Sequence, residues 1–397
     1  MKVLQINSVC GYGSTGRIVV DLYHTLEEHG YDCCVAYGRN SAPKYIEALR
    51  IGCKKDIFFH VLKTRFMDKH GFGSKKATQN LLNQIRAWGP DIIHLHNIHG
   101  YYINIELLFN YIKEMQIPVI WTLHDCWTFT GHCAHYDNVG CNQWVGGCHN
   151  CPQRETYPNS WFHDRSQFNY LQKRELFLGV KDMTIVTPSL WLKHQVEHSF
   201  LKYYPVSVIP NGIDLTKFIT YRGKKKEKTK LQLLRKYHIR PDQCICLGAA
   251  SVWTKEKGFD DFLCMGRLTS QCHFILAGVS ERQKKKLPAN ITGISRTNSI
   301  QELVDLYNGA DVFLNPTYAD TYPTVNLEAH ACGLPIISYR TGGSTEIADI
   351  VVEKGDFRSM VLNAEDSSVK DKIKAEWQLS DKNECYNKYL ELYLRRN

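Results

Sequence analysis

The fold is decided first by residues 1–17, MKVLQINSVCGYGSTGR. Lys2–Ile6 has the apolar character of a buried strand, and the glycines after it allow a tight turn and a close approach of the backbone to a ligand. The region lacks both the apolar length and the small-residue cleavage site of a signal peptide. It therefore predicts a strand, a glycine-rich loop and a helix, the first unit of an α/β sheet.

Short apolar strands alternate with helical stretches along the rest of the chain, a pattern typical of parallel sheets covered by helices. The strands expected in a first sheet are Lys2–Ile6, Asp32–Ala36, Asp91–His94, Val119–Thr122 and Thr184–Thr187. Those expected in a second sheet are Cys244–Gly248, His273–Ala277, Asp311–Asn315 and Pro335–Ser338. Because ligands bind at the carboxyl ends of the strands in such sheets, we expect the functional residues there.

The chain has 397 residues, enough for two domains of ordinary size. Its 43% hydrophobic and 22% charged residues exclude a disordered or fibrous protein, and no apolar run approaches the ~20 residues that span a bilayer. A strand at Val206 that runs into a Pro–Asn–Gly turn marks the break between the sheets. We expect domains over residues 1–204 and 205–376, and a C-terminal helical segment over 377–397 that returns to the first domain.

The formal charge is +9, and much of it lies in two clusters, Lys224–Lys228 and Arg282–Lys286. Such clusters usually form a solvated loop or helix face. The functional alternative is contact with an anionic membrane surface, worth ~1 kcal/mol for each basic residue. Nucleic acid is not an expected partner, because no aromatic side chains are interleaved with the basic ones.

The glycine-rich loop has the spacing Gly-x-Gly-x-x-Gly, at Gly11, Gly13 and Gly16. A helix that begins in this loop presents free N–H groups to an anion. The second expected strand runs into Val35–Arg39 without the acidic residue that binds a nicotinamide ribose. The loop therefore predicts an anion site, and a nicotinamide cofactor is disfavoured.

Several histidines follow the ends of two expected strands. His124 precedes Asp125 directly after Val119–Thr122, and the segment IHLHNIHG contains His94, His96 and His99. A lone histidine is more often structural than functional, but the place at a strand end beside an aspartate favours a functional role for His124. The three upstream histidines could bind a metal; we interpret them as the lining of a ligand cleft.

Two segments of the second half also carry charged side chains near strand ends. Lys257 follows Cys244–Gly248 and precedes a helix, where a lysine either meets a diphosphate as a point charge or is simply exposed in a first helical turn. Asp320 and Glu328 lie eight residues apart, one in a loop and the other in a helix. They can therefore hold two hydroxyl-bearing groups of one ligand, while the N-terminus of that helix binds phosphate.

Together these segments resemble the retaining GT-B glycosyltransferases of family 4 over nearly the whole chain. Asp320 and Glu328 match the family's two glutamates, which implies that Asp320 contacts the transferred sugar and Glu328 the ribose. Lys257 matches the lysine that binds the diphosphate, and His124 matches a histidine that touches the sugar near the reacting carbon.

Further donor-binding residues are implied by the same resemblance, namely Gly13, Ser14, Arg17, Tyr322, Pro323, Thr324 and Val325. Pro188–Ser189 and Asn211–Gly212 match the family's interdomain positions. This sequence departs from the family pattern at two places: Asp320 is one methylene shorter than glutamate, and Ser251 stands where an arginine is frequent. Arg17 or Lys255 would then supply the second cation for the diphosphate.

The resemblance implies an α/β GT-B fold, in which two Rossmann-like domains with parallel sheets face a central cleft. The first domain would meet the acceptor and the second the nucleotide sugar. Lys257 and helix-end N–H groups would stabilise the charge that develops on the leaving phosphate. The chain has no Asp-x-Asp triplet, so we expect no obligatory metal or other cofactor. Retention is expected through same-face attack, with His124 orienting the sugar.

The chain has fifteen cysteines, of which four lie in the loop 131–153 with the spacing Cys133-x7-Cys141-x6-Cys148-x2-Cys151. A CxxC knuckle with two further thiols is typical of structural zinc, and a closed four-thiolate site is preferred. His132, His135 and His149 are competing ligands. Disulfides and a redox CxxC are the alternatives. The other cysteines are interpreted as buried apolar residues.

These observations predict a cytoplasmic, metal-independent glycosyltransferase of surface polysaccharide or exopolysaccharide biosynthesis. Its partners would be a nucleotide-sugar donor, a glycan or polyprenyl-linked acceptor and the inner membrane face. One alternative is a GT-B hydrolase or epimerase of nucleotide sugars, with His96 or Asp125 as an additional base. Another is a zinc-bearing module that binds sugar or membrane without catalysis.

Overall fold

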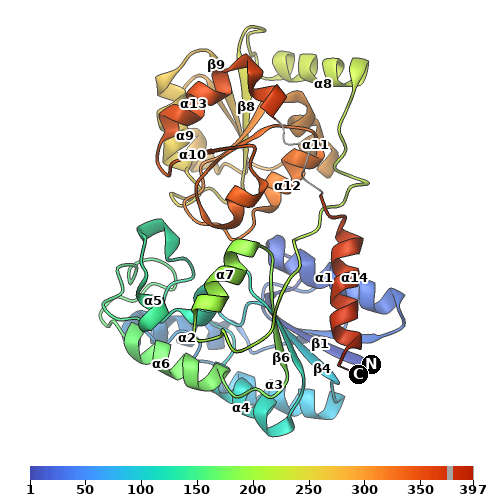
Figure 1. Cartoon of the computed structure of the whole chain (residues 1–397), viewed down its shortest axis with the longest axis vertical. Helices are drawn as coiled ribbons and strands as arrows, with labels where there is room; N and C mark the ends of the chain where they lie inside the picture. Colours follow the sequence, from blue (N-terminus) through green and yellow to red (C-terminus); the bar gives the residue numbers. More distant parts are fainter. Residues whose placement is uncertain (373–378, 397) are drawn as a thin grey trace. The chain divides into compact units, whose positions relative to one another are not determined.

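The computed structural model describes residues 1–372 and 379–396, which form two compact units. One unit comprises Met1–Pro210 and Asn383–Asn397, and the other Asn211–Lys382 (Figure 1). The first boundary lies after residue 210 rather than 204, because Val206–Val208 pairs with a strand of the first sheet. The expected start of the C-terminal segment, residue 377, lies outside the described residues.

The first unit contains a seven-stranded parallel sheet in the order β3-β2-β1-β4-β5-β6-β7. Its strands are β1 (Lys2–Val9), β2 (Asp32–Arg39), β3 (Ala48–Arg50), β4 (Ile92–Leu95), β5 (Val119–Thr122), β6 (Met183–Thr187) and β7 (Val206–Val208). Its longer helices are α1 (Gly13–Glu28), α2 (Lys54–Met67), α3 (Lys75–Trp88), α4 (Ile105–Met115), α6 (Ser166–Phe177), α7 (Leu190–His198) and α14 (Lys382–Leu394). The central strands are buried on both faces, which explains why the sequence shows continuous apolar runs rather than alternation.

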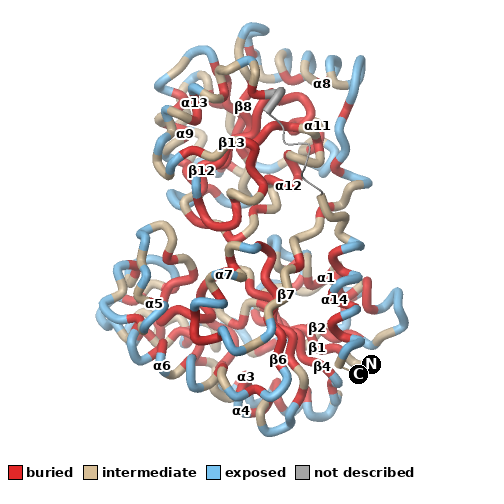
Figure 2. The backbone as a smooth tube through the Cα atoms, in the orientation of Figure 1, coloured by how far each residue is buried: buried red, intermediate tan, exposed pale blue. Residues whose placement is uncertain are grey.

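The second unit contains a six-stranded parallel sheet in the order β10-β9-β8-β11-β12-β13. Its strands are β8 (Cys244–Ala249), β9 (Cys272–Ala277), β10 (Ile291–Ile294), β11 (Val312–Asn315), β12 (Ile336–Tyr339) and β13 (Ile350–Val352). Its helices are α8 (Gly223–Lys236), α9 (Phe259–Leu268), α10 (Glu281–Lys284), α11 (Ile300–Gly309), α12 (Thr324–Ala331) and α13 (Phe357–Glu365). Buried strands lie inside each unit and the outer helix faces are exposed (Figure 2).

These two sheets confirm the expected fold class, two Rossmann-like domains with parallel sheets. Each strand expected from the sequence is present, with ends shifted by at most three residues. The sequence did not indicate three short strands, β3, β10 and β13, which lie at sheet edges.

The C-terminal helix α14 packs its buried side chains into the core of the first unit. Tyr393 Oη lies 2.6 Å from His94 Nδ1, and His94 Nε2 lies 2.8 Å from Thr122 Oγ1. Thr122 donates in turn to Tyr389 Oη at 3.1 Å. Because Thr122 donates to Tyr389, it accepts from His94 Nε2–H, and His94 Nδ1 accepts from Tyr393. A fully paired buried network thus fixes the helix on the sheet.

No helix within the described ranges combines the length and the apolar character that crossing a bilayer requires.

We predict that Tyr393→Phe destabilises the protein by about 1–3 kcal/mol, because it leaves a buried nitrogen of His94 without a partner. Urea unfolding followed by fluorescence measures the change. Tyr203→Phe is the matched control, since Tyr203 is 75% exposed, and it should not alter stability. Equal stability of the two variants would contradict the importance of this network.

Candidate functional site

The loop between β1 and α1 has the backbone shape that its glycines predicted. Gly11 and Gly13 have φ values of +74° and +66°, and the Gly11 N–H donates to the Gly16 carbonyl at 2.9 Å. A Cβ on Gly13 would meet no atom within 4 Å, so the space beside this residue is open. Ser14 and Arg17 are exposed in the first turn of the helix. The free N–H groups of this turn are therefore accessible to an anion.

The ends of β4 and β5 bring two of the candidate histidines together. His124 Nε2 lies 3.1 Å from His96 Nδ1, and His96 Nε2 lies 3.3 Å from Gln5 Oε1 on β1. Gln5 donates its own amide to Val19, so its oxygen accepts from His96 and His96 accepts from His124. The relay fixes the tautomer and the ring orientation of His124. Gln5 was not indicated by the sequence, where it resembles any polar residue in a strand.

The prediction that His94 lines a cleft is wrong. Its side chain is fully buried between Thr122 and Tyr393, as described above. The partner Tyr393 is 299 positions away along the chain, so local sequence gave no sign of it.

Asp125 is held by a different histidine. Its Oδ2 lies 2.7 Å from His99 Nε2, and its Oδ1 accepts from the Trp127 N–H at 2.9 Å. His99 also lies 2.9 Å from the Tyr157 hydroxyl. Burial raises the pKa of the Asp125 carboxyl, but the charge and hydrogen bond of His99 outweigh burial and lower that pKa to about 2. Asp125 is therefore ionised at neutral pH, and it orients His99 and the start of the following loop.

His124 is neutral at physiological pH. Burial lowers the pKa of His124 to about 4 and that of His94 to about 3. A neutral imidazole can accept or donate a hydrogen bond but brings no positive charge to a ligand.

In the second unit, Lys257 and Asp320 form an ion pair with 2.6 Å between Nζ and Oδ2. The two side chains are 38% and 19% exposed. Asp320 Oδ1 also accepts from the Tyr322 N–H at 3.1 Å. The structure thus joins two residues that the sequence placed in separate motifs, one after β8 and the other after β11.

Close backbone contacts bring these two loops together. Gly258 has a φ of +75°, and a Cβ there would lie 2.3 Å from the Pro316 carbonyl oxygen. Gly342 has a φ of +48°, and a Cβ there would lie 2.0 Å from the carbonyl oxygen of Asp320. Both positions therefore require glycine: a larger residue at 258 would push the Lys257 loop away from Pro316, and one at 342 would displace the Asp320 loop.

Glu328 lies on α12 and is buried. Its Oε2 accepts from the Tyr307 hydroxyl at 2.9 Å, so a residue of α11 orients the carboxylate. The helix α12 begins at Thr324, followed by Val325, directly after Tyr322 and Pro323. The Asn211 side chain donates a hydrogen bond to the Tyr322 carbonyl at 3.3 Å. The resemblance did not indicate Tyr307, because its role depends on the packing of α11 against α12.

The four loop cysteines, Cys133, Cys141, Cys148 and Cys151, line one small cavity of about 10 Å³ in the first unit. The alternative of disulfides is not present, since all four are thiols. A second thiol group, Cys244, Cys246 and Cys272, lies on β8 and β9 with its sulfur atoms within 4.8 Å of one another. The sequence had indicated only buried apolar residues there.

Two Rossmann-like domains with parallel sheets are the architecture of the GT-B class. The sequence pattern described as Glycosyltransferase Family 4 matches residues 15–217, and that of Glycosyl transferases group 1 matches residues 241–372. The first match alone covers half of the chain, so the chain belongs to Glycosyltransferase Family 4.

Among curated relatives, the putative colanic acid biosynthesis glycosyl transferase WcaC of Escherichia coli strain K12 is 26% identical to this chain over 231 aligned residues. The match covers 54% of this chain and 55% of that protein. The capsular polysaccharide biosynthesis glycosyltransferase CapM of Staphylococcus aureus is 22% identical, over 49% of this chain and 54% of its own. The chain therefore spans about half the length of these relatives.

Solved structures share the fold. Sucrose-phosphate synthase of Thermosynechococcus elongatus aligns with a TM-score of 0.65 and 14% identity, over 99% of this chain and 98% of that one. HepE of Anabaena aligns with a TM-score of 0.66 and 12% identity over the whole of both chains. At this identity the likeness concerns the architecture alone.

We predict that stability falls as the pH is lowered from 7 to 5. The folded-state pKa values of His94 and His124 lie below the unfolded value of about 6.5. The contribution of these neutral histidines to folding stability is therefore complete above about pH 6.5 and is lost as the pH falls toward about 4. At pH 5 the loss is about 2 kcal/mol for each histidine. Urea unfolding at both pH values measures it.

The variant His94→Gln should lose about 2 kcal/mol less than the wild type between these pH values, because one buried titrating group is gone. His29→Gln is the control, since His29 is exposed, and it should retain the wild-type dependence. The same pH dependence in all three proteins would contradict the assignment.

Proposed function

We propose that this protein transfers a sugar from a nucleoside diphosphate donor, with retention of configuration, to a hydroxyl of a glycan or polyprenyl-linked acceptor in surface polysaccharide or exopolysaccharide biosynthesis. The observation that carries the proposal is the Lys257–Asp320 pair at 2.6 Å, next to the N-terminus of α12 and the oriented carboxylate of Glu328. Family membership and the names of the relatives WcaC and CapM support the reaction class and the pathway.

In the donor site, Lys257 binds the diphosphate as a point charge and stabilises the charge that develops when the glycosidic bond breaks. The N–H groups of Thr324 and Val325, in the first turn of α12, bind phosphate oxygens. Glu328 accepts hydrogen bonds from the ribose hydroxyls, and Tyr307 holds it in position for this role. Gly13, Ser14 and Arg17 provide a further anion-binding loop on the first unit.

Asp320 holds hydroxyls of the transferred sugar. In the structure its carboxylate accepts a hydrogen bond from the ammonium of Lys257. The diphosphate replaces this carboxylate on Lys257, which frees Asp320 for the sugar. His124 is neutral, so it orients the sugar by hydrogen bonding rather than by charge. The leaving phosphate oxygen accepts the proton of the attacking hydroxyl on the same face, which gives retention.

We also propose that transfer needs no divalent metal, since the chain has no Asp-x-Asp triplet and Lys257 can neutralise the diphosphate. A cytoplasmic site of action fits the fifteen cysteines, all of which are thiols. Transfer that persists during brief exposure to EDTA supports the metal-independent reaction, and immediate loss of transfer contradicts it.

Contact with the inner membrane face is supported by exposed aromatic side chains on and beside α2, namely Phe58, Phe59, Phe66, Trp161 and Phe162. Phe66 contacts both Trp161 and Phe162, which joins the helix to a later loop. The basic cluster Lys224–Lys228 lies on the polar helix α8 of the second unit. Aromatic rings and basic side chains suit the interface of an anionic bilayer. Sedimentation with anionic but not with neutral vesicles is the expected result.

The donor site is tested with UDP, GDP, ADP and dTDP and their sugars. Uridine nucleotides come first, because HepE of Anabaena is described in complex with UDP and with UDP-glucose. At 100 times its dissociation constant a nucleotide should stabilise the protein by about 2.7 kcal/mol, a shift that thermal unfolding resolves. Lys257→Ala should weaken binding about 10- to 100-fold, the loss of one charged hydrogen bond.

Lys286→Ala is the matched control, because Lys286 is an exposed lysine of the same unit outside the donor-binding residues and should leave donor affinity within about twofold. If both lysine variants bind the preferred nucleotide like the wild type, the donor-site assignment is wrong.

Asp320→Asn should separate the two roles of that carboxylate. Because it releases Lys257, the affinity for a free nucleoside diphosphate should stay equal or increase, while transfer falls about 100-fold through loss of the sugar contact. Calorimetry and product analysis measure the two effects. A parallel loss of nucleotide affinity and transfer would show that Asp320 does not compete with the diphosphate.

Product analysis also separates the alternatives. Free sugar released equally with and without acceptor would indicate a hydrolase, and an isomerised donor an epimerase with His96 or Asp125 as a base. A binding module would be indicated if the protein turned over no donor and if substitution of Asp320 or Glu328 left its function intact.

A further inference from the structure

The segment between β5 and α6 has little regular structure to hold it. Between residues 123 and 165 it forms two short 3-10 turns, Trp127–Phe129 and Asp137–Val139, and one helix, Gln143–Gly146. Nevertheless Cys133 and Cys148 are buried inside it. A buried irregular segment must be fixed by contacts other than backbone ladders.

Four thiols meet in the interior of this segment. Cys133, Cys141, Cys148 and Cys151 line the cavity of about 10 Å³ introduced above. The Gly131 N–H donates to Cys148 Sγ at 3.1 Å. Backbone N–H groups that donate to sulfur favour the thiolate form, which is the metal-binding form.

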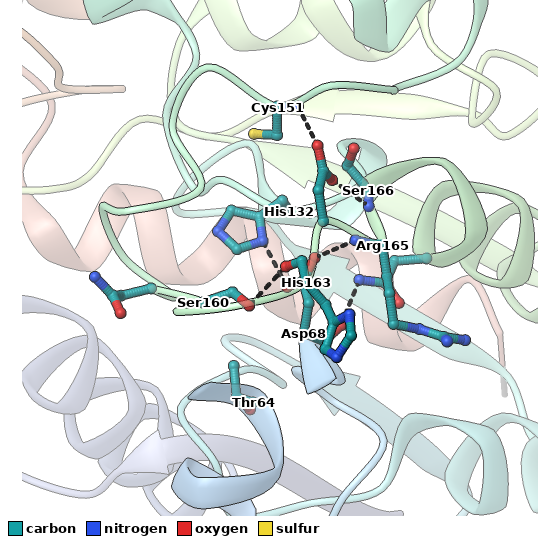
Figure 3. Close-up of polar contacts among 12 residues, drawn as sticks. Thr64, Asp68, His132, Cys151, Ser160, His163, Arg165 and Ser166 are labelled. Atoms are coloured by element: carbon teal, nitrogen blue, oxygen red, sulfur yellow. Dashed lines mark hydrogen bonds and ion pairs between the residues drawn. The ribbon is translucent and has the colours of Figure 1, made fainter. Parts of the chain in front are cut away.

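A buried histidine faces the same cavity with one unsatisfied nitrogen. His132 Nδ1 lies 2.7 Å from Asp68 Oδ1, and both side chains are 0% exposed (Figure 3). Asp68 is fixed in turn, because its Oδ2 accepts from the Arg165 N–H at 2.8 Å. His132 Nε2 has no hydrogen-bond partner, although the residue lines the cavity beside Cys133 and Cys151. A histidine oriented by a carboxylate is the usual support of a metal centre.

A buried cation also lies near the thiols. Lys173 is 1% exposed, and its Nζ donates to the carbonyls of Trp127 at 2.7 Å and Thr130 at 3.1 Å. Within the described parts of the chain no carboxylate forms an ion pair with it. Burial lowers the pKa of the Lys173 ammonium to about 7, and ionisation of Cys148 or Cys133 would raise that pKa. A buried ammonium requires negative charge close by.

We propose that Cys133, Cys141, Cys148 and Cys151 bind one structural Zn²⁺ ion as four thiolates. Binding releases four thiol protons to solvent and leaves a centre of net charge −2. Lys173 offsets part of this charge, and His132, whose Nδ1–H donates to Asp68, lines the site beside the thiolates. With four protein ligands the ion has no open position, so it holds the loop after His124 and takes no part in the transfer reaction.

Among the described residues the metal-like spacing of 4.8 Å occurs only in Cys244, Cys246 and Cys272, so the loop thiols are further apart than in a metal centre. Binding of an ion therefore requires the loop thiols to move closer together in the cavity that they already line. The strand thiols are weaker candidates for a closed tetrahedral site, because only three of them come together.

The experiment measures metal in the full-length protein purified without chelator. Mass spectrometry of metals should find one zinc per chain in the wild type and in Cys53→Ser, a matched control with an exposed thiol in the same unit. Cys148→Ser and Cys141→Ser should each contain less than about a tenth of that zinc. Cobalt exchanged into wild-type protein should show the intense thiolate-to-metal absorption of a tetrahedral four-sulfur site, a readout that requires no variant to fold.

The variant His132→Asn should keep one zinc but release it at least about tenfold faster to a chromogenic chelator, because the buried ring that lines the site and is held by Asp68 is lost. Donor binding by the second unit should not change in any of these variants, so the result is independent of the proposed function. The proposal would be overturned if wild-type protein contained no metal and its four loop cysteines reacted as free thiols. A disulfide among these four cysteines, found by mass spectrometry, would also overturn it. Iron in place of zinc would overturn the choice of metal.

Discussion

Parallel strand pairing is the constraint on which the rest of the structure depends. Every strand of a parallel sheet ends at the same edge, so residues that follow different strands meet there although they lie far apart in sequence. His96 follows β4 and His124 follows β5, 28 residues later, yet their nitrogens are 3.1 Å apart. Lys257 and Asp320 follow β8 and β11, 63 residues apart, and form an ion pair. The apolar strands between them supply the rigidity that fixes these distances.

Burial then determines which of these groups carry charge. His124 is deep enough to remain neutral, whereas Asp125 remains ionised because His99 and the Trp127 N–H compensate its burial. The Lys257–Asp320 pair is partly exposed, so water screens its attraction and the pair contributes about 1 kcal/mol or less. A weak resting pair suits a site that a diphosphate enters, since two phosphate charges can replace one carboxylate on the lysine.

The sequence predicted what is local and periodic. Long apolar strands, the glycine loop at Gly11–Gly16 and the helix at Lys382–Leu394 all follow from short patterns and are present. The strands β3, β10 and β13 were missed because three or four residues at a sheet edge carry too little pattern. The wrong place given to His94 has a different cause: its partner Tyr393 is set by tertiary packing. Tyr307, whose hydroxyl donates to the Glu328 carboxylate, was not predicted for the same reason.

The loop after β5 shows how the two kinds of information combine. Asp125, next to His124, accepts from the N–H of Trp127, and the Trp127 ring centroid lies 3.4 Å from the ammonium of Lys173. That ammonium also binds the Thr130 carbonyl, and the Thr130 hydroxyl donates to the carbonyl of Cys133. A continuous chain of contacts therefore runs from the strand end to the thiol cavity. Cysteine spacing alone suggested a metal, and the buried lysine and the unpaired histidine nitrogen are the structural observations that support the proposed zinc centre.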